Sequence, residues 1–126
     1  MPTVDVDGLS DAVMEQLKQY SIATQKEINA AAKEVGKACA KQLRRTSPKG
    51  QGEYAKGWTS TVAYESLDDV RVVVHNKAKP QIVHLLEHGH AKVNGGRVPG
   101  IPHVAPAEEN AAESFTRKVE EALSQV

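Results

Sequence analysis

The sequence has one cysteine, few aromatic residues and no long apolar run. Cys39 has no second cysteine to pair with, so an internal disulfide is excluded and a reducing, intracellular origin is expected. Aromatic residues make up 4% of the chain, too few for the stacked side chains that bind single-stranded nucleic acid. No apolar run approaches the ~20 residues that cross a bilayer, and the acidic N-terminus lacks the residue order of a signal peptide. We therefore expect a soluble protein made in the cytoplasm, with no membrane partner.

The chain also lacks an excess of either charge. Its 16 lysines and arginines balance 16 aspartates and glutamates, so the whole-chain charge does not indicate a nucleic acid or an anionic membrane as partner. The charges are nevertheless segregated, since residues 33–103 carry twelve basic and six acidic side chains and both flanking segments are acidic. This distribution would suit head-to-tail contacts between copies. A basic nucleic-acid-binding module remains an alternative interpretation of the middle segment.

Apolar spacing and turn residues predict an α+β fold in a single domain, residues 1–126. We expect a small, mostly antiparallel sheet, with a long N-terminal helix, a short middle helix and a C-terminal helix packed on one face. The expected elements are a long helix over 9–45, a β-hairpin over 57–75, a short helix over 80–89, a projecting loop over 90–103 and a C-terminal helix over 106–124. A helix of this length would be ~50 Å long, so part of it is expected to meet another chain.

The same pattern predicts the core. Cys39 should be a small buried or half-buried side chain rather than a reactive thiol. The apolar stripe of the first helix includes Ala38. The other residues expected in the core are Trp58, Val62, Val72, Val74, Leu86, Phe115 and Val119.

One stretch raises the possibility of catalysis. His84-x-x-Glu87-His88 has the H-x-x-E-H order of an inverted zinc-peptidase helix, with two imidazoles one turn apart and a carboxylate beside them. However, Pro80 and Gly89 cut this helix short, and the chain is too small to supply a second lobe around a substrate. A third ligand would have to come from the loop or just beyond it, namely His90, His103 or Glu108. We therefore expect no enzyme, cofactor or metal, and keep a small zinc hydrolase as the alternative.

The order of the parts resembles the gene-product-ten-type tail-component family of tailed bacteriophages. The resemblance runs from about residue 10 to 124. It is carried by a basic turn at 46–52, the Tyr54-x-x-Gly57-Trp58 start of a strand, Leu86-Glu87-His88-Gly89 and the proline-rich run at 102–107. The sequence departs from the family at residues 103–105, where many members have an aromatic residue and an arginine.

The resemblance implies a structural virion protein of the head–tail connector, at the neck or in tail completion. Such proteins form rings that join head and tail. The implied partners are further copies of the chain, head-closure or adaptor proteins, tail-tube or tail-terminator proteins, and DNA that passes through the lumen without sequence-specific binding. The protein would be made in the host bacterial cytoplasm and carried in the virion.

Within this interpretation the loop and its flanks are expected to contact neighbouring subunits. Glu87 is expected to hold the loop, either by accepting backbone N–H groups or by pairing with a loop cation. The residues assigned to the contact are Glu87, His88, His90, Lys92, Arg97 and His103.

Overall fold

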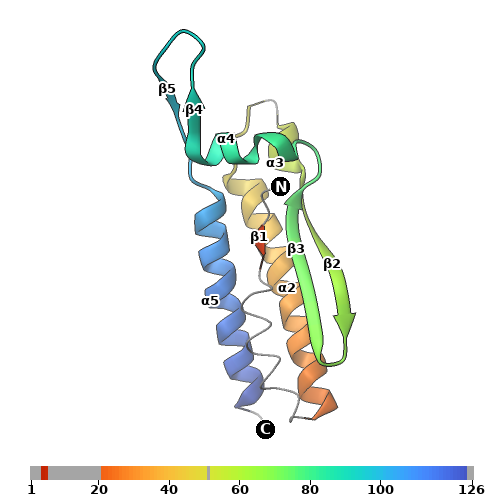
Figure 1. Ribbon diagram of the computed structural model, residues 1–126. Coiled ribbons are helices and arrows are strands. Elements are labelled where there is room, and N and C mark those ends of the chain that lie inside the picture. Colours follow the sequence, from red (N-terminus) through yellow and green to blue (C-terminus); the bar gives the residue numbers. More distant parts are fainter. Residues whose placement is uncertain (1–3, 6–20, 51, 125–126) are drawn as a thin grey trace.

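The computed structural model describes residues 4–5, 21–50 and 52–124, and it confirms the α+β class (Figure 1). Two long helices, α2 and α5, run side by side, and α2 also packs against the hairpin of β2 and β3. The elements are β1 (Val4–Asp5), α2 (Ile22–Thr46), α3 (Glu53–Lys56), β2 (Trp58–Ser66), β3 (Asp69–Asn76), the 3₁₀ turn η1 (Pro80–Ile82), α4 (Val83–His88), β4 (Gly89–Ala91), β5 (Arg97–Pro99) and α5 (Val104–Leu123).

Helix α2 begins at a serine cap. Ser21 is extended, with φ −64° and ψ 157°, and its hydroxyl accepts the N–H of Thr24 at 3.2 Å. The prediction of one continuous helix from residue 9 is therefore wrong at Ser21, and residues 9–20 lie outside the described part of the chain. With 25 residues, α2 is about 37 Å long. This helix is shorter than the one expected, and its length does not by itself require another chain.

The main sheet is antiparallel with the strand order β1-β3-β2. Strands β2 and β3 pair from Trp58↔Asn76 to Ser66↔Asp69, and a two-residue turn joins them. The register shifts between Val62 and Tyr64, which marks a β-bulge in the outer strand. This hairpin coincides with the one expected over 57–75.

The core lies where α2 meets the sheet and α5. Trp58, Val72 and Phe115 are at most 1% exposed. Gly36 allows the close approach of α2 to the sheet, because a Cβ at this position would lie 2.5 Å from Val72 Cγ1 and 2.7 Å from Ser60 Oγ. A glycine in mid-helix is therefore a packing requirement here.

Two predicted core residues are exposed. Val62 is 43% exposed, because β2 is the outer strand and lies at the edge of the sheet. Ala38 faces solvent, and Cys39 takes its place in the buried stripe at 3% exposure. Leu86 is half-buried against the core. The other predicted core residues, Trp58, Val72, Val74, Phe115 and Val119, are buried.

The segments α4, β4 and β5, which follow β3, lie at one end of the molecule (Figure 1). The short helix expected over 80–89 is present as η1 followed by α4. The projecting loop expected over 90–103 is instead a hairpin up to residue 99, because β4 and β5 pair in antiparallel fashion around a turn that contains Gly95 and Gly96, both at positive φ. Helix α5 begins at residue 104, two residues earlier than expected. None of the helices in the described part of the chain has an apolar stretch that could span a bilayer.

Candidate functional site

The hairpin of β4 and β5 projects from the end of the molecule (Figure 1), and we call residues 89–100 the arm. Its strands pair at Gly89↔Pro99, His90↔Val98 and Ala91↔Arg97. Almost all of its side chains are exposed, and Val93 at the tip has an exposed fraction of 103%. Such a small two-stranded hairpin is only marginally stable alone. Its position must therefore be set by contacts at its base.

Two glycines form the base of the arm where its strands cross α4. Gly89 has φ +80°, and a Cβ on it would overlap the backbone of Val98 and Gly100. A Cβ on Gly100 would overlap the backbone of Glu87 and His88. The N–H of Ile101 donates to the carbonyl of Leu86 at 2.8 Å. Any side chain at either glycine would therefore push the arm away from α4.

Glu87 joins the base of the arm to the start of α5. Its Oε1 accepts the N–H groups of His103 and Val104 at 2.7 and 2.8 Å, and its Oε2 accepts that of Ala105 at 3.0 Å. A helix leaves its first four N–H groups without partners. The fourth position here is Pro106, which has no N–H, so Glu87 and the proline together leave none of the four unsatisfied.

The Glu87 carboxylate is 7% exposed. Burial acts to raise its pKa, but the hydrogen bonds from the backbone N–H groups of Val104, His103 and Ala105 outweigh burial, so the pKa is lowered. The first of the two predicted roles for Glu87, acceptance of backbone N–H groups, is therefore seen, and the loop cation is not its partner. Arg97 instead donates to the carbonyl of His88 at 3.0 Å.

His103 is buried beside Glu87, with an exposed fraction of 1%. Its Nδ1 lies 2.7 Å from the carbonyl oxygen of Ile101 and 3.0 Å from Glu87 Oε1. Both neighbours are acceptors, so Nδ1 carries a hydrogen. Its Nε2 lies 2.6 Å from the Tyr54 hydroxyl. Burial and the charge of Glu87 raise the pKa of Tyr54, so the phenol keeps its proton and can donate it to Nε2.

Aromatic packing connects this network to the rest of the domain. The Tyr54 ring stands edge-on to Trp58 and to His103, with centroids 5.8 and 5.6 Å apart. The indole N–H of Trp58 donates to the Ser47 hydroxyl at 2.8 Å, and the Asn76 amide donates to the carbonyl of Tyr54 at 2.7 Å. The base of the arm is thereby connected to α2, α3, β2 and β3, which fixes its orientation on the body.

The predicted contact residues divide into two groups. Glu87 and His103 lie in the interior, because they satisfy the backbone N–H groups and the carbonyl at the base of the arm. Exposed positions on or beside the arm are occupied by His88, His90, Lys92 and Arg97. Only the second group offers a surface to another molecule.

The geometry does not favour the zinc alternative. His84 and His88 are exposed with ring centroids 4.8 Å apart, but both oxygens of the buried Glu87 are engaged by backbone N–H groups at the start of α5. A general base is therefore missing from the His84/His88 pair. Within the described residues, no group of three His, Cys, Asp or Glu side chains could hold a metal ion.

Sequence reasoning missed Tyr54, Ser47 and Asn76 as members of this network. The signal for Tyr54 was its spacing of four residues from Trp58, which puts both rings at the α3–β2 junction. Nothing local indicated its pairing with His103, because the two residues are 49 positions apart.

Charge is divided between the arm and α5. The arm carries Lys92 and Arg97, and no acidic residue lies between Glu87 and Glu108. Helix α5 carries five exposed acids, Glu108, Glu109, Glu113, Glu120 and Glu121. The segregation noted in the sequence thus separates a basic projection from an acidic helix.

Comparison with protein families matches residues 11–89 to the HK97-gp10-like family, described as "Bacteriophage HK97-gp10, putative tail-component". Comparison with curated proteins and with solved structures yields no match. The family match contains the Glu87-x-Gly89 step but stops there, so it is shorter than the resemblance and leaves most of the arm and α5 outside. Since it nevertheless covers more than half of the chain, the protein belongs to the HK97-gp10-like family of bacteriophage tail components.

Proposed function

We propose that the protein is a ring-forming subunit of the head–tail connector of a phage or prophage, acting at the neck or in tail completion. The observation that carries the proposal is the arm, a projecting hairpin held firmly at its base in a chain of a tail-component family. A rigid projection of this kind suits contact with a neighbouring subunit, because little conformational entropy is lost on binding.

The role we infer is structural rather than catalytic. The most elaborate cluster of titratable groups, Glu87, His103 and Tyr54, is buried and its hydrogen-bonding atoms are engaged with one another or with backbone. Groups used in this way position chain segments and leave no atom facing a substrate.

The proposed partners are those implied by this place in the virion. They comprise further copies of the chain, a head-closure or adaptor protein on one side, and a tail-tube or tail-terminator protein on the other. DNA would pass through the lumen of the ring without sequence-specific binding, because the protein would interact only with the charge of the DNA phosphates. Synthesis would take place in the host cytoplasm before incorporation into the particle.

The test replaces the outer part of the arm, residues 91–97, by a short Gly-Ser linker in the phage or prophage that encodes the protein. We expect filled heads and free tails to accumulate unjoined in electron micrographs, with the infectious titre strongly reduced. Substitution Ala63→Ser, at an exposed position of β2, serves as the control. Normal joining of heads to tails by the linker variant would refute the proposed role of the arm.

A further inference from the structure

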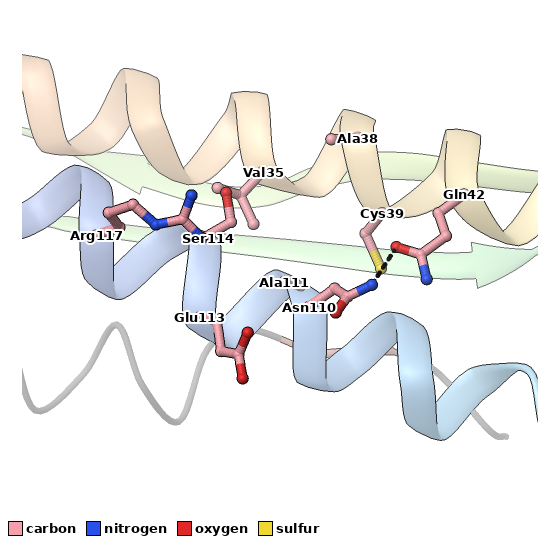
Figure 2. A pocket seen from close by; sticks show the side chains of 9 residues that line it. All are labelled: Val35, Ala38, Cys39, Gln42, Asn110, Ala111, Glu113, Ser114 and Arg117. Atoms are coloured by element: carbon pink, nitrogen blue, oxygen red, sulfur yellow. Dashed lines mark hydrogen bonds between the residues drawn. The ribbon is translucent and has the colours of Figure 1, made fainter.

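A pocket of about 280 Å³ opens on the seam between α2 and α5 (Figure 2). Figure 2 shows both helices in front of the strands, with the Gln42 side chain and Asn110 at one end of the pocket and Arg117 at the other. Gln42 and Asn110 are hydrogen-bonded at 3.2 Å. The apolar part of the lining comes from Val35, Ala38, Cys39 and Ala111. The polar part of the lining comes from Gln42, Asn110, Glu113, Ser114 and Arg117. The pocket is therefore a small hollow of mixed lining, with room for one small apolar side chain beside its apolar part.

The arm presents a side chain that has no partner among the residues that the structure describes. Val93 is fully exposed at the tip, in a turn where polar residues and glycine are usual. The arm points away from α2 and α5 (Figure 1), so Val93 cannot reach the pocket of its own copy. An exposed apolar side chain and a partly apolar pocket elsewhere on the same surface are the elements of a head-to-tail contact between copies.

The charges around the two features complement each other. Lys92 and Arg97 flank the tip of the arm, while Glu113 lines the pocket and Glu108 and Glu109 precede it on the same helix. The charge of Glu108 also acts on the pocket lining. Burial, and after it the Glu108 carboxylate, raise the pKa of the Cys39 thiol, which lines the pocket, to about 11.

Cations near the pocket restrict how the arm could lie. Arg117 closes one end of the pocket, and Lys37 and Lys41 stand on α2 beside its α2 lining. These charges would repel the cations of an arm lying over α2. The cations of the arm are therefore attracted only along α5, at the end of the pocket nearer Glu108. This restriction selects one orientation for the arm of the second copy.

We propose that the arm of one copy inserts Val93 into the α2–α5 pocket of a second copy, with Lys92 and Arg97 over the acidic rim of α5. The proposal rests on the proposed ring-forming function and names the surfaces that join neighbouring subunits. Because the two surfaces differ, the contact is heterologous and generates a ring when the rotation between neighbours closes.

The experiment uses two full-length variants that each lose one surface. The arm variant combines Lys92→Glu with Val93→Asp, and the pocket variant carries Ala38→Trp at an exposed position on the lining. Val62→Asp is the matched control, since Val62 is another exposed valine, on β2. Mass is measured by sedimentation and light scattering over a concentration series, and circular dichroism verifies the fold of every variant.

We expect the wild type and Val62→Asp to associate, and each surface variant to lose at least about tenfold in association constant. A mixture of the arm and pocket variants should form a 1:1 dimer and nothing larger, because only one intact arm and one intact pocket remain to meet. Association of the arm variant at wild-type strength, or a mixture that stays monomeric, would overturn the proposal. A wild type that is monomeric throughout would also overturn it, whereas the proposed function is judged separately by the particle assay.

Discussion

Replacement of Glu87 tests the central claim that one buried carboxylate holds the arm to α5. In Glu87→Gln the amide oxygen can still accept the N–H groups of His103 and Val104, but an NH₂ group takes the place of Oε2 and faces the N–H of Ala105. Two donors then oppose each other. One hydrogen bond to a charged acceptor, ~1.5–3 kcal/mol, is lost, together with ~0.5–1 kcal/mol of attraction between the carboxylate and the helix dipole. The expected loss in free energy of unfolding is about 2–4 kcal/mol.

The measurement is urea-induced unfolding at pH 7, with Glu109→Gln on the exposed face of α5 as the control. The control should change stability by less than ~0.5 kcal/mol. Because a side chain that is 7% exposed is part of the interior, we expect its replacement to lower the stability of the fold as well as to affect assembly. A loss below ~0.5 kcal/mol for Glu87→Gln would refute the reasoning, since it would mean that the capping bonds contribute nothing.

The pH dependence gives a second, independent readout of the same group. The pKa of Glu87 is lowered in the folded state, so its contribution is fully present above the unfolded pKa of ~4.3. It is lost as pH falls through the lower, folded pKa. Wild-type stability should therefore decline more steeply than that of Glu87→Gln below about pH 4.3. Parallel pH profiles for the two proteins would contradict a lowered pKa.

Three further predictions concern the surroundings of Glu87 and the core. Tyr54→Phe leaves Nε2 of buried His103 without its 2.6 Å partner and should cost ~1–3 kcal/mol in urea unfolding; an unchanged stability would show that this bond is unimportant. Gly89→Ala adds a Cβ at φ +80° against the backbone of Val98, so it should loosen the arm and accelerate hydrogen exchange of its amides. Unaltered exchange would argue against the close contact of the two strands at Gly89 and Gly100. Burial and Glu108 raise the pKa of Cys39 to about 11, so the native thiol should react with iodoacetamide at pH 8 far more slowly than in urea; equal rates would contradict its burial.

The fold class could be predicted from the sequence because its signals are local. Alternating β-branched residues and a tight turn place the β2–β3 hairpin, and Pro80 and Gly89 bound the short helical segment formed by η1 and α4. The start of α2 at Ser21 was hidden, since the apolar spacing of the sequence runs through this position and only the capping hydroxyl marks it. The exposure of Val62 depends on which strand forms the edge of the sheet, and strand order is not a local property.

The site was predictable only in part, because several of its contacts join residues far apart in the sequence. The role of Glu87 as an acceptor of backbone N–H groups could be foreseen from a carboxylate before a glycine and a helix start. The burial of His103 could not, because it depends on Tyr54 and on the crossing at Gly89 and Gly100, which the tertiary fold brings together. The strands of the arm are three residues each and lack an apolar alternation, so their pairing is set by that crossing rather than by the pattern of the sequence.

The rigid base of the arm bears on how an assembly of defined size could form. A ring of fixed subunit number requires the same rotation between each pair of neighbours, and a contact made through a swivelling hairpin would allow a range of rotations. Glu87 fixes the arm relative to α5, the helix whose seam with α2 forms the proposed receiving pocket. Glu87→Gln, at a temperature where it stays folded, should therefore still associate but give a broader distribution of masses than the wild type. A distribution as narrow as that of the wild type would show that the angle between neighbours is set elsewhere on the molecule.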